Sequence, residues 1–182
     1  MNIVFGLWAD GRAVPEHGAA GPAAAGSPVL GPLGLLDALE TMLGFGSPQT
    51  AEVERIAAWQ SKLETVDGGR FWTRSFEADP WTTARRVLEM RDGLMAGGWD
   101  AAAQWIAPRL VDLAAAESAG DVAPKGVADR LDELVREIDD RVGTVLSEVR
   151  LIELRADLPP GWRRLSITGY GPNRVSLSDS VY

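Results

Sequence analysis

The chain has 182 residues, enough for one sizeable hydrophobic core, and its 46% hydrophobic and 24% charged residues are typical of a folded globular protein. It has no cysteine and one histidine, His17, which excludes disulfides and thiolate chemistry and leaves almost nothing for a transition-metal site. The net charge of −8 argues against an isolated nucleic-acid binder, because affinity for phosphate comes from Lys and Arg.

Apolar residues run almost without interruption through residues 2–8, which predicts a strand buried on both faces of a parallel sheet. Residues 9–26 are rich in Gly, Ala and Pro and predict a loop, and residues 27–31 predict a second, very short strand. Leu and Met at helical spacing then predict a helix over residues 35–43, which Gly44 ends.

A second helix is expected after Thr50, whose hydroxyl is a candidate N-cap. Its apolar face is expected to comprise Val53, Ile56, Ala57 and Leu63, with Glu52, Glu54, Arg55 and Lys62 turned outward. Aromatic, Thr and Ser residues in partial alternation predict a third strand over residues 70–76. Asp79 and Pro80 then form a typical helix start, because Asp caps free N–H groups and Pro lacks an N–H that would be unpaired there.

The rest of the chain predicts more helices and a last strand. Residues 101–118 predict one helix or two short ones, bent at Pro108. The clearest helix is expected over residues 127–142, where apolar residues repeat at spacings of three and four, namely Leu131, Leu134, Val135, Ile138 and Val142. Residues 148–154 predict a strand. Because strands and helices alternate, we expect a helix-rich three-layer α/β domain with a small, mainly parallel sheet.

The turn from Gly31 to Gly34 lies between the second strand and the first helix, where a nucleotide-binding loop places N–H groups against phosphate. Such a loop also needs a Lys and a Ser or Thr, whereas this helix opens with Leu35, Leu36 and Asp37. We interpret the turn as structural, with anion binding as the alternative. His17 has no nucleophile motif beside it, so we expect no catalytic residue, cofactor or metal.

The strongest basic group consists of four arginines on or just before the helix that follows Pro80: Arg74, Arg85, Arg86 and Arg91. They are candidate contacts for a phosphate backbone or an acidic partner, and the alternative is a solvated face paired with Glu89 and Asp92. The acids of the helix over residues 127–142 are scattered around it, which predicts a solvated face rather than a metal site. Most of the seven tryptophans are expected in the core, with stacking on nucleic-acid bases as the alternative.

Residues 75–84 (SFEADPWTTA), continuing through RDGL at residues 91–94 to GWD at residues 98–100, resemble a known family. The chain looks like the N-terminal region of AddB-like, PD-(D/E)XK nuclease-family proteins that have a UvrD-like helicase body. Residues 30–37 (LGPLGLLD), together with VRLIE before LPPGW in residues 149–162, support the same resemblance.

The resemblance implies a degenerate RecA-like helicase lobe over residues 1–165 with an internal helical insertion, followed by an irregular tail over residues 166–182. The change of composition at this tail suggests truncation or a shifted reading frame. The implied function is that of a non-catalytic domain or fragment of a bacterial-type exonuclease that processes double-strand breaks in DNA for recombination repair. It would act as a scaffold and contact DNA ends or a helicase-nuclease partner subunit through the four arginines.

No catalytic residue is carried over, because nothing in the chain matches the nuclease carboxylates and lysine of that family. The alternative function is a stand-alone interaction module, whose helix over residues 127–142 docks against a partner helix. Neither a signal peptide nor about 18 consecutive apolar residues is visible, so we expect a cytoplasmic protein without membrane contact or a small-molecule substrate.

Overall fold

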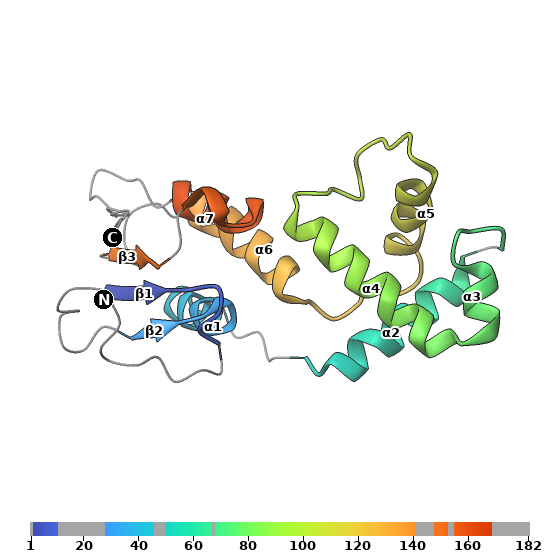
Figure 1. Ribbon diagram of the computed structural model, residues 1–182, viewed down its shortest axis with the longest axis horizontal. Helices are drawn as coiled ribbons and strands as arrows, with labels where there is room; N and C mark the ends of the chain where they lie inside the picture. Colours follow the sequence, from blue (N-terminus) through green and yellow to red (C-terminus); the bar gives the residue numbers. More distant parts are fainter. Residues whose placement is uncertain are drawn as a thin grey trace. The chain divides into compact units, whose positions relative to one another are not determined.

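The computed structural model describes residues 2–10, 28–45, 50–66, 68–140, 148–152 and 155–168. In chain order, the elements are β1 (Asn2–Phe5), β2 (Val29–Leu30), α1 (Pro32–Leu43), α2 (Glu52–Thr65), α3 (Thr73–Ala78), α4 (Pro80–Ala96), α5 (Pro108–Glu117), α6 (Val127–Asp140), β3 (Glu148–Leu151), the 3₁₀ helix η1 (Arg155–Asp157) and α7 (Pro160–Thr168) (Figure 1). The protein is therefore a helix-rich α/β protein with a small parallel sheet.

The chain divides into two compact units. The sheet unit comprises Met1–Ser47 and Arg130–Tyr182, and the helical unit comprises Pro48–Asp129. The helical unit is thus inserted in the sequence of the sheet unit, and α6 begins in one unit and continues in the other. Within the described ranges, every helix is too short or too polar to cross a lipid bilayer.

The sheet has the strand order β2-β1-β3, and β1 pairs in parallel with both neighbours. Val4 aligns with Val29 in β2 and with Arg150 in β3. Ile3, Val4 and Phe5 are all buried, which confirms the prediction of a central apolar strand. Side chains alternate between the faces of a strand, so Ile3 and Phe5 share one face and Val4 lies on the other.

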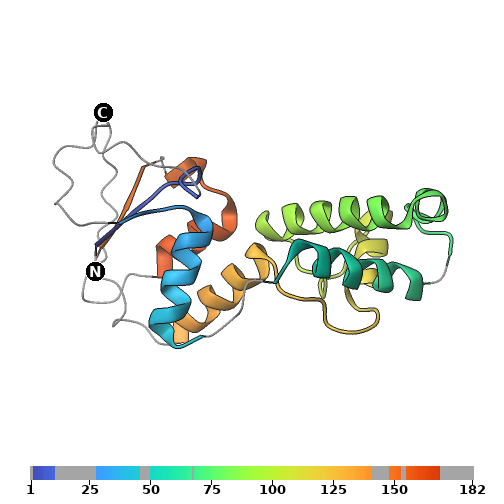
Figure 2. The same cartoon turned by 90° about the horizontal axis from the view of Figure 1, so that it is seen from below.

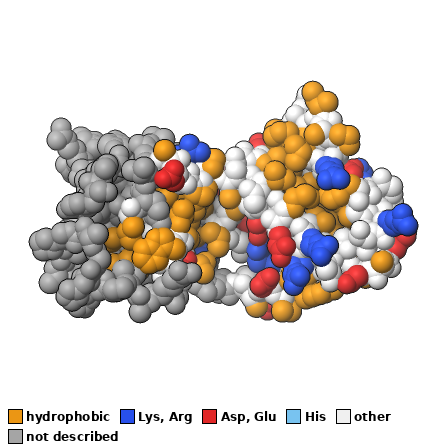
Figure 3. Space-filling model, in the orientation of Figure 1, with side chains coloured by type: hydrophobic (Ala, Val, Ile, Leu, Met, Phe, Trp, Pro, Cys, Tyr) orange, Lys and Arg blue, Asp and Glu red, His pale blue; other side chains and the backbone are white. Residues whose placement is uncertain are grey.

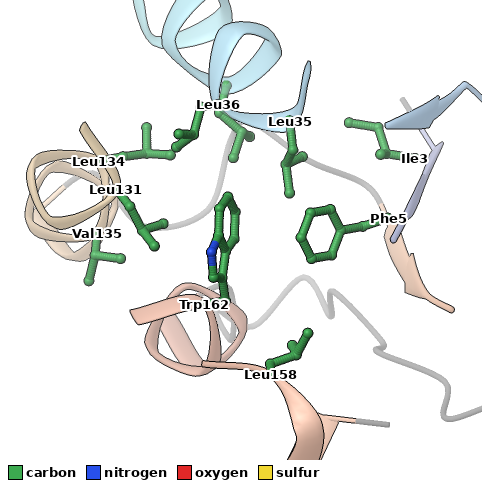
Figure 4. Close-up of a cluster of buried hydrophobic side chains, with 10 residues drawn as sticks. Ile3, Phe5, Leu35, Leu36, Leu131, Leu134, Val135, Leu158 and Trp162 are labelled. Carbon is green, nitrogen blue, oxygen red and sulfur yellow. The ribbon is translucent and has the colours of Figure 1, made fainter. Parts of the chain in front are cut away.

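The core of the sheet unit lies on the face that carries Ile3 and Phe5. There α1, α6 and α7 converge around Trp162, whose ring stacks on Phe5 with 5.0 Å between ring centroids (Figure 4). The remaining buried members are Leu35, Leu36, Leu39, Leu131, Leu134, Val135 and Leu158. The predicted helices over residues 35–43 and 127–142 are therefore confirmed in the described ranges, although Val142 lies outside them.

In the helical unit, α2 and α4 lie side by side, which both ribbon views show (Figures 1 and 2). The buried core between these helices and α5 comprises Ile56, Trp59, Leu63, Trp72, Ala84, Val87, Leu88, Trp99, Leu113 and Ala116. The predicted start of α4 is confirmed, because the Asp79 carboxylate accepts the N–H of Thr82 at 3.1 Å and Pro80 is the first helical residue.

The third strand predicted over residues 70–76 is wrong. Residues 70–72 form a turn, and α3 follows, with Trp72 buried and Phe76 partly buried against the same core. Aromatic residues suggested a strand, but the spacing of four between Trp72 and Phe76 places both on one side of a helical turn. The Phe76 N–H accordingly donates to the Trp72 carbonyl at 2.9 Å.

The apolar face of α2 also differs from the prediction. Val53 is 63% exposed, and the buried positions are Ile56, Trp59, Lys62 and Leu63. Lys62 was expected to point outward, but its ammonium donates to the carbonyls of Glu117 and Ala119 at the end of α5. Thr50 is not the cap either, because the N-cap of α2 is Ala51, which makes no side-chain cap hydrogen bond.

Two predicted boundaries move as well. The helix predicted within residues 101–118 begins only at Pro108, because the residues before it form turns. The tail predicted from residue 166 is wrong at its start, because α7 continues to Thr168. Residues 169–182 lie outside the described residues, as does His17.

Candidate functional site

The turn that leads into α1 is closed by a carboxylate from the segment after β1. Asp10 Oδ2 accepts the N–H of Leu33 at 2.7 Å, and Asp10 Oδ1 accepts the N–H of Gly34 at 3.1 Å. The first N–H groups of a helix have no partner within it and carry the positive end of the helix dipole. Asp10 therefore occupies the place where a phosphate-binding loop would hold its anion.

Gly31, the N-cap of α1, is needed for this contact. A Cβ at Gly31 would lie 2.2 Å from the backbone nitrogen of Asp10, so only glycine allows this approach. Sequence reasoning identified the turn and interpreted it as structural, but it missed Asp10. The available signal was topological, because parallel strands bring their carboxyl ends, and the residues that follow them, to the same edge of a sheet.

Asp37, which stands near the start of α1 where a phosphate-binding loop would need Lys and Ser or Thr, belongs to a different contact. The buried Arg130 donates to Glu40 through Nε at 2.8 Å and through Nη2 at 2.7 Å, and also to Asp37. These hydrogen bonds raise the pKa of Arg130 above its ordinary value. The three charged groups therefore link α1 to α6 inside the sheet unit, beside the apolar core.

Arg91 is not available as a surface contact, which corrects the prediction for this residue. Its side chain is 7% exposed, and its guanidinium forms paired hydrogen bonds with Glu117, at 2.9 Å each, and with Asp129. Burial by itself lowers the pKa of Arg91, but the hydrogen bonds that Arg91 donates to these carboxylates outweigh it and raise the pKa above its ordinary value. The fork of the guanidinium is therefore fully used inside the protein.

A second arginine completes this buried ion network. Arg55 donates to both carboxylate oxygens of Asp92, at 2.8 and 2.9 Å, and to the Pro124 carbonyl at 3.2 Å. Asp129 also accepts the N–H of Gly126 at 2.8 Å. Burial raises the pKa of Asp129, but the hydrogen bonds from Arg91 lower it by more than burial raises it, so the net pKa lies below the ordinary value. Asp92 therefore pairs with buried arginines and not with an exposed basic face.

The other three predicted arginines, Arg74, Arg85 and Arg86, are exposed. Arg85 Nε lies 3.7 Å from Glu89, as the solvated-face alternative predicted. The hydrogen bond from Thr82 is the largest cause of the lowered pKa of Asp79, and the charges of Arg85 and Arg86 add to it. The structure thus brings Arg85 and Arg86 together on a surface that also holds carboxylates, with Arg74 on α3.

The acids of α6 whose side chains the structure describes do not form one solvated face. Asp129 pairs with Arg91 in the core of the helical unit, whereas Asp132 pairs with Arg136 and Arg164 at 3.0 Å each. In the described ranges, no group of three or more His, Asp or Glu residues is placed to hold a metal ion.

The tryptophans divide between core and surface. Trp59, Trp72, Trp99 and Trp162 are buried, as expected for most of them, whereas Trp8 and Trp81 are each 41% exposed.

Comparisons of the chain with protein-family models, with curated proteins and with solved structures find no match.

Proposed function

We propose that the chain is a non-catalytic scaffold domain, the N-terminal domain or a fragment of an AddB-like DNA-repair exonuclease with a degenerate RecA-like lobe. The observation that carries the proposal is the turn before α1. The N–H groups of Leu33 and Gly34, which have no partner within the helix, donate to the Asp10 carboxylate. A nucleotide phosphate would have to displace a carboxylate that is covalently part of the same chain.

The order of elements supports the same proposal. A parallel strand, β2, leads through a glycine turn directly into α1, at the carboxyl edge of the sheet, where nucleotide-binding α/β proteins place their phosphate. The turn has no Lys for phosphate, and the Asp10 carboxylate takes the place of the anion at its N–H groups. A scaffold that retains a helicase-like fold without its nucleotide chemistry explains both features.

The alternative, a stand-alone module that docks through α6, is less well supported. The apolar face of α6 already packs in the core of its own unit through Leu131, Leu134 and Val135. Docking of a partner helix on that face would require this core to open. The buried contacts of α6 therefore favour the scaffold over this form of the alternative.

Titration of the full chain with ATP and magnesium, with calorimetry as the readout, tests the proposal. We expect no binding by the natural sequence and none of the turnover that a nucleotide-hydrolysing lobe shows. ATP hydrolysis that is lost on altering the turn between Gly31 and Gly34 would refute it. Binding to blunt DNA ends across a salt series tests the DNA contact separately: a steep fall in affinity with salt supports the contact, and a flat response removes it while leaving the scaffold role.

A further inference from the structure

Exposed apolar and basic side chains gather where the turn at Arg70 and Phe71 meets the start of α5. Phe71 is 37% exposed, and the centre of its ring lies 5.7 Å from the guanidinium carbon of Arg109. Ile106, two residues before α5, is 97% exposed. Figure 3 shows hydrophobic side chains over α5 and the connection before it, with a basic side chain among them. We call Phe71, Arg74, Ile106 and Arg109 the α5 surface.

The aromatic centre of the α5 surface is held in place before any partner binds. Asp112 on α5 accepts the Phe71 N–H at 3.1 Å and pairs with Arg70 at 2.8 Å. The Phe71 ring also meets the ring of the buried Trp72 edge to face, with 4.8 Å between ring centroids. A side chain that is already fixed loses little conformational entropy on binding, so this exposed ring is suited to an interface.

The charge of the α5 surface favours an acidic partner group. Arg74 and Arg109 are exposed, and within the described residues neither forms an ion pair. The nearby carboxylate of Asp112 is already engaged by Arg70 and by the Phe71 N–H. The N-terminus of α5 has no side-chain cap and no acid in its first turn, so the positive end of its dipole adds to the same potential.

The apolar residues favour a protein partner over a nucleic acid. Ile106 gains from burial against other aliphatic side chains, which a phosphodiester backbone does not offer. Exposed aromatic and Arg side chains are also enriched in protein interfaces. The net charge of −8 repels an extended polyanion, whereas a short protein segment needs only one or two carboxylates at the arginines.

We propose that the α5 surface binds an amphipathic helical segment of a partner protein that presents apolar side chains beside Asp or Glu. This inference rests on the proposed function and adds the kind of partner that the scaffold would bind. Phe71 and Ile106 receive the apolar stripe, and Arg74 and Arg109 pair with the acids. A helix bound on a surface contacts it through side chains three or four positions apart. The 5.7 Å between the Phe71 ring and the Arg109 guanidinium carbon suits contacts from two such side chains.

Fluorescence anisotropy on the full chain tests this proposal with three labelled probes: an amphipathic peptide with a leucine stripe flanked by Glu, the same peptide with Lys in place of Glu, and oligothymidylate. We expect the acidic peptide to bind about tenfold more tightly than the basic one, and Arg109→Ala and Ile106→Ala each to weaken it by about fivefold or more. Arg136→Ala and Val53→Ala are matched controls, since each replaces an exposed side chain of the same kind on another helix.

Equal affinities for the two peptides would overturn the proposal, and so would unchanged affinity in Arg109→Ala and Ile106→Ala. Binding of oligothymidylate, but not of the acidic peptide, through the same residues would overturn it in favour of a nucleic acid. Ile106 is almost fully exposed, so its replacement leaves the core intact and a loss of binding is not a loss of folding. Absence of peptide binding would not refute the non-catalytic scaffold. ATP hydrolysis would refute the scaffold and would leave the peptide result unchanged.

Discussion

Replacing Arg91 with Met is expected to destabilise the helical unit by about 3–5 kcal/mol, the cost of removing one partner from a buried ion pair. Methionine preserves most of the volume but leaves the carboxylates of Glu117 and Asp129 without their main cation. These side chains are 27% and 18% exposed, so water screens part of the loss. Arg55 also remains 3.9 Å from Asp129, and we therefore expect a value in the lower half of the range.

Urea unfolding followed by tryptophan fluorescence measures this loss, because five of the seven tryptophans lie in the helical unit. Arg85→Met is the matched control on the same helix. Its side chain is 49% exposed and its Nε lies 3.7 Å from Glu89, so the expected loss is below about 1 kcal/mol. A loss in Arg91→Met no larger than that in Arg85→Met would show that the network does not stabilise the fold.

The same variant has an expected pH dependence. The folded-state pKa of Asp129 lies below its ordinary value of 3.8, so its stabilisation is present above that value and is lost as the pH falls through the folded-state pKa. The difference in unfolding free energy between the natural sequence and Arg91→Met should therefore be largest near neutral pH and shrink below pH 3.8. A difference that stayed constant across this range would exclude Asp129 as the partner that matters.

Three further substitutions test the turns of the sheet unit. Asp10→Ala should cost about 0.5–2 kcal/mol and speed amide exchange at Leu33 and Gly34, because both N–H groups lose their acceptor. Gly31→Ala should cost about 1–3 kcal/mol in thermal unfolding, since its Cβ meets the backbone of Asp10, which cannot rotate away. Gly44→Ala should cost only about 1 kcal/mol, because φ is +78° but nothing lies within 4 Å. Equal losses at Gly31 and Gly44 would contradict the packing argument.

Local sequence signals predicted the elements whose cause is local. The apolar run of β1, the Asp79 and Pro80 start of α4 and the Gly44 end of α1 each follow from a few adjacent residues, and each is found. The burial of β1 on both faces could also be predicted from the sequence, because an uninterrupted apolar run has no polar face to expose to solvent. The turn before α1 was recognised for the same reason.

Contacts between distant residues were beyond these signals. Arg91 is separated from Asp129 by 38 positions, and Asp10 from Leu33 by 23. From its sequence neighbours alone, a charged residue is predicted to be exposed, because burying an unpaired charge is costly. Only the fold shows that a partner of opposite charge is present. The same reasoning placed Lys62 outside, although two carbonyl groups at the end of α5 hold its ammonium in the core.

The composition therefore misrepresents which charges are available for function. In the described residues, the carboxylates that accept backbone N–H groups at turns or helix starts include those of Asp10, Asp79, Asp100, Asp112 and Asp129. The most deeply placed arginines, Arg55, Arg91 and Arg130, are bound by carboxylates inside the protein. A partner meets only what these contacts leave exposed, and in the described part of the helical unit that includes Arg74, Arg86 and Arg109, none of which forms an ion pair there. For the proposed contact at the α5 surface, the cations that matter are therefore the exposed Arg74 and Arg109 and not the arginines bound inside the protein.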